Sequence, residues 1–241
     1  MRSTLLRVDD SIIRVNRYAN HLIISLDEGQ LNLTHFASHI QKCNYPWCIE
    51  VIASEKEICL VTNEQFSQRN LGQLSQEYHS SDNHNNKQIH IPFVISESND
   101  IEKVLAHYSA SNSNNRIKST ADLSTLIEQT SFTISMFGFM PGFFYIKGIP
   151  RMYFMPRKSI PAKRVASGSI AIGGPYLGIY NTPSPGGWHV LAKTPININI
   201  DDIVGKLPIG TQIKFSSVSH EIYNHLEENN LGLTQYNESH A

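Results

Sequence analysis

Short apolar runs punctuated by glycine and proline fill the chain from Phe132 to about residue 218, and this pattern constrains the fold most. The runs read TISMFGF, FFYIKG, YFMP, SIAIGG, LGIY, WHVLA, ININI and QIKFSSV. Turn residues recur roughly every 8–12 positions, which is typical of an all-β sandwich or barrel. This part of the chain is therefore predicted to be all-β. A last helix is predicted from Ser219 to about Glu228, followed by a frayed tail over residues 231–241.

The first third of the chain mixes the periodicities of strands and helices. Four short apolar runs predict strands, at residues 12–15, 21–25, 48–52 and 58–62. Two sets of apolar residues at helical spacing predict helices: Leu33, Phe36 and Ile40, then Phe66, Leu71 and Leu74. The resulting order, ββαββα, predicts a small α+β domain.

A polar segment over residues 79–87 (HSSDNHNNK) carries no large apolar side chain and predicts a linker. We therefore expect an N-terminal α+β domain over residues 1–88 and a β-rich domain over residues 89–241, so that the fold class is α+β. A second polar stretch, 111–116, separates two predicted helices, one after Asn99 and one after Ser119.

Charge and composition argue against several classes of protein. The formal net charge is −1, which gives no electrostatic footprint for nucleic acid or anionic lipid. No apolar run reaches the roughly 18 residues that a membrane span requires, and no apolar stretch follows the arginines of residues 1–10 as in a signal peptide. The three cysteines lack any CxxC spacing and are interpreted as free thiols, so we expect a cytoplasmic protein.

The segment 137–145 (FGFMPGFFY) is the densest candidate for a binding site. Two glycines and a proline among five aromatic residues predict a tight turn beside a strand. Aromatic side chains on such a turn can form a wall for a small flat ligand, and this assigns Phe139, Pro141, Gly142 and Phe143 to the site. The alternative is an aromatic corner of the core, because apolar clusters are usually buried.

Two glycine-rich segments add further candidates. The segment 168–174 (GSIAIGG) is neither a P-loop nor a dinucleotide fingerprint, and it contributes Ser169 and Gly174. The segment 184–188 (SPGGW) predicts a turn whose backbone N–H groups can hold an anion while Trp188 stacks on a ligand. It contributes Ser184, Gly186, Gly187 and Trp188. The alternatives are a β-bulge for the first segment and a hairpin turn with a packed tryptophan for the second.

Basic residues cluster between these segments. Five positive charges lie within residues 151–164 with no Asp or Glu among them, and Lys193 follows later. Such a cluster can bind a carboxylate or phosphate, and Arg157, Arg164 and Lys193 are the candidates. The alternative is a solvated basic face.

Histidines provide no clear catalytic or metal site. His35 and His39 are four residues apart on a predicted helix, but no third ligand can be named, so no metal is expected. His189 is a possible acid or base, although strand alternation would point it opposite to Trp188. No Gly-x-Ser-x-Gly elbow is present, and the catalytic residues stay unassigned.

The motifs together resemble a known family. The series GFMPGFFY (138–145), PRKSIP (156–161), GSIAIGG (168–174), GIY (178–180), SPGGW (184–188) and KTP (193–195) is similar in order and spacing to the carboxyltransferase-domain family of subunit 1 type. That family contains the B subunit of 5-oxoprolinase, the KipI-type kinase inhibitor and the allophanate hydrolase subunit 1 domain. The N-terminal third is similar in layout, so the resemblance covers nearly the whole chain.

The resemblance implies a cyclophilin-like β-barrel behind a small α+β domain. It also implies a component of a 5-oxoprolinase similar to its B subunit, which opens 5-oxoproline to glutamate together with a homologous C subunit and an A subunit. ATP would be a co-substrate of that complex, although no nucleotide motif is visible in this chain. The expected steps, phosphorylation of the lactam oxygen and then hydrolysis, need cationic groups and backbone dipoles near the developing negative charge.

The chain departs from the family at several positions that are usually polar. Ile127 stands where the family usually has a histidine, Ala162 where it has an arginine, and Tyr176 and Leu177 where it has Gln-Thr. Lys193 replaces an arginine, which is not neutral at a bidentate site. These departures favour the alternative of a non-catalytic KipI-type module that inhibits a sensor histidine kinase; an allophanate or urea-pathway hydrolase subunit is a further alternative.

Overall fold

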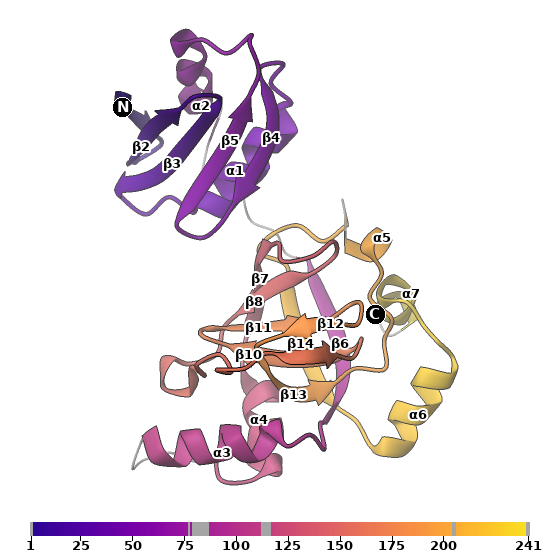
Figure 1. Cartoon of the computed structure of the whole chain (residues 1–241). Helices are drawn as coiled ribbons and strands as arrows, with labels where there is room; N and C mark the ends of the chain where they lie inside the picture. Colours follow the sequence, from indigo (N-terminus) through magenta and orange to yellow (C-terminus); the bar gives the residue numbers. More distant parts are fainter. Residues whose placement is uncertain (1, 77, 79–86, 112–116, 204–205, 240–241) are drawn as a thin grey trace. The chain divides into compact units, whose positions relative to one another are not determined.

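The structure is a computed structural model that describes residues 2–76, 78, 87–111, 117–203 and 206–239 (Figure 1). The chain divides into two compact units, Met1–Asn85 and Asn86–Ala241. Most of the predicted linker and of the polar stretch 111–116 lies outside the described residues. Because each unit has its own apolar core, the two are described separately.

The N-terminal unit is a five-stranded antiparallel sheet in the order β1-β2-β3-β5-β4 with a helix packed on it. Its elements are β1 (Arg2–Val8), β2 (Ser11–Tyr18), β3 (His21–Glu28), α1 (Leu33–Cys43), β4 (Cys48–Ala53), β5 (Glu57–Thr62), η1 (Gln68–Gly72) and α2 (Gln73–Gln76). Asn32 caps α1, because its side chain accepts hydrogen bonds from the N–H groups of Thr34 and His35. The predicted α+β layout holds, but the sequence analysis missed β1, an edge strand with Leu5 exposed.

The C-terminal unit is built around a closed barrel of seven strands in the order β10-β11-β8-β7-β14-β6-β13. These strands are β6 (Gln88–Ile95), β7 (Phe132–Phe137), β8 (Phe144–Lys147), β10 (Ser169–Gly173), β11 (Tyr176–Ile179), β13 (His189–Lys193) and β14 (Gln212–Ser217). Neighbouring strands are antiparallel except β14 and β6, which are parallel. The prediction of an α+β fold with a barrel is confirmed.

Helices and a short ribbon surround the barrel. They are α3 (Asp100–Ser111), α4 (Thr120–Gln129), η3 (Arg151–Tyr153), α5 (Ile200–Ile203), α6 (His220–Glu228) and α7 (Leu233–Ser239), with the ribbon β9 (Ala162–Val165) and β12 (Ser184–Gly186). The helices α3 and α4 pack against β13 and β14, whereas α6 and α7 pack against β6 (Figure 1). A capping box between Ser119 and Asp122 begins α4, as the sequence predicts. None of the described helices is long and apolar enough to cross a membrane.

Two sequence-based predictions about this unit are wrong. The sequence predicts a frayed tail, but the tail forms α7, in which Leu233 and Tyr236 are buried. The helix is tied down by Asp202, whose carboxylate accepts a hydrogen bond of 2.6 Å from the Thr234 hydroxyl. The segment 184–188 is predicted to contain a turn, but residues Ser184–Gly186 form strand β12 because β9 pairs with them.

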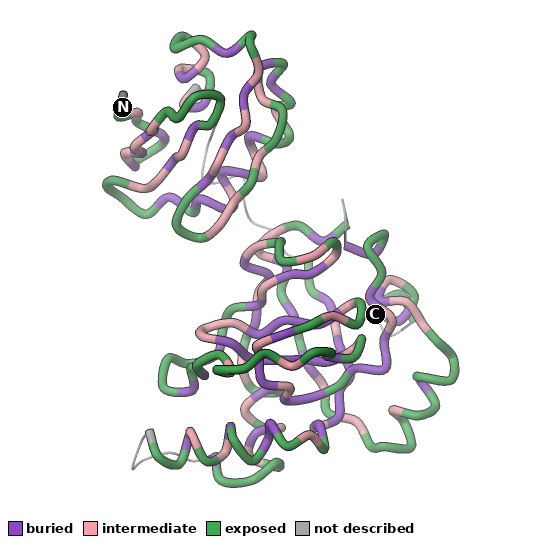
Figure 2. Tube along the Cα trace, in the orientation of Figure 1, coloured by how far each residue is buried: buried purple, intermediate pink, exposed green. Residues whose placement is uncertain are grey.

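Strand alternation divides the barrel wall into two apolar faces, and this division positions the site. In Figure 2 the barrel strands are largely buried, since both faces of the wall are covered. Phe144, Ile146, Ile170 and Ile172 belong to the main core, together with Leu177 and Ile179. The residues between them, such as Ala171, face a second cluster outside the barrel. The candidate pocket lies on this outer face.

Candidate functional site

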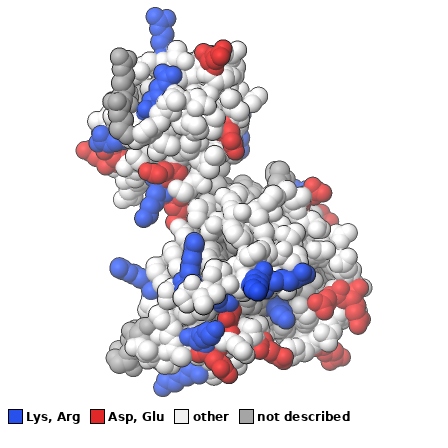
Figure 3. Space-filling view, in the orientation of Figure 1, with Lys and Arg blue, Asp and Glu red and all other residues white. Residues whose placement is uncertain are grey.

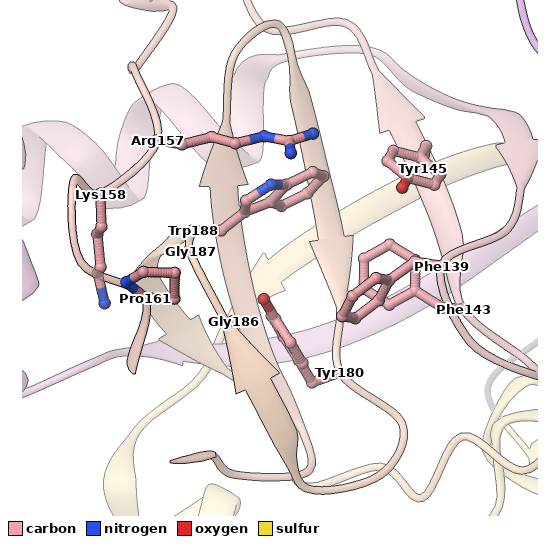
Figure 4. A pocket seen from close by; sticks show the side chains of 10 residues that line it. All are labelled: Phe139, Phe143, Tyr145, Arg157, Lys158, Pro161, Tyr180, Gly186, Gly187 and Trp188. Carbon is pink, nitrogen blue, oxygen red and sulfur yellow. The ribbon is translucent and has the colours of Figure 1, made fainter. Parts of the chain in front are cut away.

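A pocket of about 190 Å³ opens on the outer face of strands β8, β10 and β11 (Figure 4). It is lined by Phe139, Phe143, Tyr145, Arg157, Lys158, Pro161, Tyr180, Gly186, Gly187 and Trp188. Five of these residues are aromatic, two are basic and none is acidic. Drug-sized ligands occupy roughly 300–1,000 Å³, so this pocket suits a smaller, flat molecule.

Aromatic rings form the floor and one wall of the pocket. Phe143 lies at the centre, with ring centroids 5.9 Å from Trp188, 5.6 Å from Tyr180 and 5.3 Å from Tyr145. All three pairs meet edge to face, an arrangement that contributes about 0.5–1.5 kcal/mol per pair beyond burial. Phe143, Tyr180 and Trp188 are buried, so they provide a rigid apolar surface.

Three glycines let these rings lie against the backbone. A Cβ atom at Gly173 would clash with the indole of Trp188, and one at Gly178 would clash with the ring of Phe143. A Cβ atom at Gly186 would clash with the hydroxyl of Tyr180. The glycine-rich segments are therefore places of close side-chain approach, which is one of the expected roles of glycine within strands.

The turn that carries Phe139 has an unusual backbone. Gly138, Phe139 and Gly142 have φ angles of 153°, 72° and 78°. A positive φ is strained for a bulky residue such as Phe139, and such strain persists only where surrounding structure enforces it. Asn181 contributes to that enforcement, since its side-chain amide donates a hydrogen bond of 2.8 Å to the carbonyl of Pro141. The Phe139 ring is consequently held at the pocket mouth, 59% exposed.

The two basic residues of the pocket differ in their surroundings. Arg157 is exposed and makes no ion pair with any described residue. Lys158 pairs with Asp100 at the start of α3, with 2.5 Å between the amine and the carboxylate. The N–H group of Val190 also donates a hydrogen bond to Asp100, at 2.9 Å. Burial opposes the charged form of Asp100, but these partners together hold its pKa below the ordinary value.

His189 lies behind the pocket, on the side of β13 that faces Asp100. Its Nδ1 atom is 4.0 Å from the Asp100 carboxylate and has no hydrogen-bond partner among the described residues. Burial lowers the pKa of His189, and the charges of Lys158 and Lys103 act in the same direction, while Asp100 opposes them. The imidazole is therefore neutral at neutral pH. His189 does not line the pocket, as strand alternation predicts.

The lowered pKa of His189 makes the stability of the barrel unit depend on pH. The unfolded chain binds a proton at His189 near pH 6.5, whereas the folded state resists it until the pH is lower. The free energy of unfolding should therefore fall as the pH drops below 6.5, by at most about 1.4 kcal/mol per pH unit. Urea denaturation at about pH 7.5 and about pH 5.5, on either side of the unfolded value, measures this, and His189→Gln should remove this part of the decrease. An equal decrease in the variant would contradict the prediction.

The structure brings together six of the thirteen predicted site residues, namely Phe139, Phe143, Arg157, Gly186, Gly187 and Trp188. Pro141 and Gly142 lie in the same turn but do not line the pocket. The remaining five, Arg164, Ser169, Gly174, Ser184 and Lys193, lie outside it: Arg164 is exposed on β9, Ser169 pairs with Lys193 across β10 and β13, Gly174 pairs with Met155, and Ser184 is on β12.

Sequence reasoning missed four lining residues: Tyr145, Lys158, Pro161 and Tyr180. Tyr145 follows the buried Phe144, so its outward direction could be inferred from strand alternation. The other three lie in loops or at strand ends, where direction depends on distant contacts. Among the described residues, no group of three or more His, Cys, Asp or Glu side chains is arranged to hold a metal ion.

Several basic side chains lie over the middle of the barrel unit on the face that Figure 3 shows. On the same face, Asp and Glu side chains lie toward the edge where α6 lies, and others lie in the lower part of the unit beside Lys and Arg side chains. An aromatic pocket with an arginine that pairs with no described residue can bind a small anion. The fold and site thus define a barrel protein with an aromatic pocket that carries an exposed arginine.

The chain belongs to the family described as the carboxyltransferase domain, subdomain C and D, whose model matches residues 15–201. It is similar to the B subunit of 5-oxoprolinase from Bacillus subtilis (strain 168), with 33% identity over 99 residues that cover 40% of this chain and 41% of the relative. It is also similar to the B subunit of 5-oxoprolinase from Escherichia coli O157:H7, with 32% identity over 112 residues that cover 46% of this chain and 48% of the relative. The chain thus matches less than half the length of either relative.

A solved structure extends the likeness in fold. The urea carboxylase of Kluyveromyces lactis superposes on 94% of this chain with a TM-score of 0.65, at 15% sequence identity and over 24% of its own length. At this identity the comparison establishes the fold alone. The family resemblance predicted from the motifs is confirmed.

Proposed function

We propose that this chain is a component of an ATP-dependent 5-oxoprolinase similar to its B subunit, in a cytoplasmic complex that opens 5-oxoproline to glutamate. Two relatives named as the B subunit of 5-oxoprolinase support the proposal. The observation that carries it is the pocket, which combines a flat aromatic surface with Arg157, a cation without an ion pair among the described residues. The partners would be a homologous C subunit and an A subunit.

The pocket matches 5-oxoproline in shape and charge. The five-membered lactam ring is nearly flat and fits against the rings of Phe143 and Trp188, while its carboxylate can pair with the guanidinium of Arg157. The buried aromatic floor excludes water from one face of the ring, which strengthens the charge interaction. We assign to this chain the roles of binding and orienting the substrate; its catalytic residues stay unassigned.

The reaction in the complex would proceed in two steps. The lactam oxygen attacks the γ-phosphorus of ATP and ADP leaves. Hydrolysis then uses two waters: the first adds to the ring carbon and the ring C–N bond breaks, which leaves an acyl phosphate, and the second cleaves the acyl phosphate into glutamate and phosphate. The chain carries no nucleotide-binding motif, so ATP is proposed as a co-substrate held by the complex. A cation and backbone dipoles near the carboxylate and lactam oxygen would lower the barrier to both steps.

Removal of the Arg157 side chain should weaken substrate binding with little effect on stability. Because Arg157 is exposed and pairs with no described residue, Arg157→Ala should leave the free energy of unfolding within about 0.5 kcal/mol of the wild type. Loss of a charged hydrogen-bonding partner should raise the KM for 5-oxoproline about tenfold or more. The assay is ATP-dependent glutamate release by the complex recovered from native lysate. Arg164→Ala, an exposed arginine outside the pocket, is the matched control, and equal effects of both variants would count against the site.

A second candidate function is a non-catalytic KipI-type module that inhibits a histidine kinase. Exposed apolar residues in the segment that carries Arg157 and Lys158 favour it, since Ile160 is 82% exposed and Met152 and Phe154 are 43% and 37% exposed. In addition, Ile127 and Leu177, which stand at usually polar family positions, are fully buried in the main core. Recovery of a kinase with no lactam turnover in any mixture would favour this candidate over the enzyme component.

A further inference from the structure

Two basic residues line the pocket, but only one offers its charge to a ligand. The amine of Lys158 is 2.5 Å from the Asp100 carboxylate, and the side chains are only 14% and 11% exposed. Figure 4 shows the amine of Lys158 directed away from the indole of Trp188, while the guanidinium of Arg157 lies beside that indole. The charge of Lys158 is therefore largely cancelled before a ligand arrives.

The charge of Arg157, by contrast, acts on the interior of the pocket. Burial raises the pKa of Tyr180 and the neighbouring Tyr145 adds to this effect, whereas the positive charge of Arg157 acts to lower it. The guanidinium is therefore close enough to affect a hydroxyl on the pocket wall. No described acidic residue pairs with Arg157.

Other titratable groups around Asp100 leave this balance unchanged. His189 lies 4.0 Å from the carboxylate and is neutral at neutral pH because its pKa is lowered. Lys103, which follows on α3, is exposed and does not line the pocket. The pocket thus presents a net positive charge at neutral pH that comes from Arg157 alone.

We propose that Asp100 determines the ligand charge that the pocket accepts. By neutralising Lys158, Asp100 makes the pocket select a flat monoanion over a flat dianion of the same framework. This inference deepens the proposed function and rests on it for the natural ligand, because 5-oxoproline is a monoanion with one carboxylate.

The test compares two ligands that differ by one carboxylate, pyrrole-2-carboxylate and pyrrole-2,5-dicarboxylate, together with 5-oxoproline. The chain has two tryptophans, so Trp47→Phe leaves Trp188 as the fluorescent reporter in the pocket. The wild-type background should bind the monoanion more tightly than the dianion. Asp100→Asn keeps the shape and the acceptor for Val190 but frees the Lys158 charge. It should improve the affinity for the dianion, relative to the monoanion, by about tenfold, as expected for one unit charge in a partly solvated site.

Two further variants separate charge from structure. The double variant Asp100→Asn, Lys158→Gln removes both charges and should restore the wild-type ratio of affinities. Lys158→Gln alone leaves Asp100 uncompensated, so it should weaken both ligands and the dianion about tenfold more than the monoanion. This second single variant also serves if Asp100→Asn fails to fold.

The outcomes distinguish this inference from the proposed function. If neither single variant alters the ratio of affinities while 5-oxoproline still binds, the role of Asp100 is overturned and the proposed function stands. If the ratio responds as expected but 5-oxoproline does not bind, the 5-oxoprolinase proposal is overturned and the role of Asp100 stands. Failure of every carboxylate to bind the wild-type background overturns both.

Discussion

Replacing Gly173 with alanine is expected to destabilise the barrel unit by about 3 kcal/mol, the upper end of the usual cost of overpacking. The added Cβ atom would overlap the indole of Trp188, which has no flexible end that can move aside. Trp188 is itself buried, with only 6% of its surface exposed. The ring must therefore leave its place against β10, and the pocket loses its floor.

Two readouts follow this displacement. In the Trp47→Phe background, emission from Trp188 should shift to longer wavelength as the indole becomes more exposed to water. Binding of 5-oxoproline or pyrrole-2-carboxylate should fall below detection, since the ring surface on which the ligand lies is displaced. Urea denaturation, followed by the same tryptophan, gives the change in the free energy of unfolding of the barrel unit.

Gly187→Ala is the matched control for this prediction. Gly187 also lines the pocket, but an added Cβ atom there would meet only the ring of Pro161, at 3.8 Å, an ordinary contact distance. The free energy of unfolding of the Gly187→Ala protein should stay within about 0.5 kcal/mol of the wild-type value. A Gly173→Ala protein with wild-type stability and unshifted emission would show that Trp188 does not pack against β10 in this way.

The sequence predicts well those features that depend on local periodicity. The residues of β10 form an apolar run bounded by glycines, and the run forms a strand as expected. Helix α4 begins after Ser119 and α6 after Ser219, because each serine side chain caps the first turn. Such signals are contained within a few neighbouring residues, so no knowledge of the tertiary structure is needed to interpret them.

Features that depend on distant contacts could not be predicted from the sequence. The strand β1 is not predicted because apolar and polar residues alternate only weakly along its seven residues. Pairing with β2 stabilises this strand. Helix α7 is held through Thr234 by Asp202, which lies 32 residues earlier in the chain. Ser184 and Gly186 form β12 only because β9 lies beside them. In each case the stabilising partner lies outside the segment whose local pattern is interpreted.

Dependence on distant contacts also explains why only part of the pocket could be predicted from the sequence. The segments 137–145 and 184–188 are predicted to be places where aromatic residues and glycines meet, and both contribute to the pocket. The basic cluster is predicted as one group, yet its members diverge: Arg157 lines the pocket, whereas Arg164 is exposed on β9. The direction of Lys158 is determined by Asp100 on α3, a partner that composition and spacing do not reveal.

Removing the charged amine of Lys158 should be among the most destabilising single substitutions in the barrel unit. Lys158→Met leaves Asp100 charged and almost fully buried, with only the N–H group of Val190 within hydrogen-bonding distance, among the described residues, to compensate it. Replacing one member of a buried ion pair lowers the free energy of unfolding by about 3–5 kcal/mol. Because both side chains are slightly exposed, we expect a loss near the lower end of this range. Urea denaturation at neutral pH measures the loss.

The double variant Asp100→Asn, Lys158→Met is the control, because it removes the buried charge together with its partner. It should recover most of the lost stability, since replacing both members of a buried pair is often nearly neutral. The difference between the double variant and the sum of the single variants gives the coupling energy of the pair. Equal losses in Lys158→Met and in the double variant would mean that the lysine stabilises the loop by packing alone.

The pH dependence provides an independent check on the same pair. In the wild type the folded pKa of Asp100 is lowered, so its contribution to stability is present above the unfolded value of 3.8 and is lost as the pH falls through the folded value. Without Lys158, burial dominates and the folded pKa should rise above the unfolded one. Stability lost at neutral pH should then be partly regained as the pH falls toward the raised value, a trend opposite to that of the wild type. Because acidification also lowers stability through His189, the comparison is made with the double variant, which lacks the Asp100 carboxylate. A Lys158→Met protein that regains no stability relative to the double variant would show that Asp100 does not depend on Lys158 for its charge.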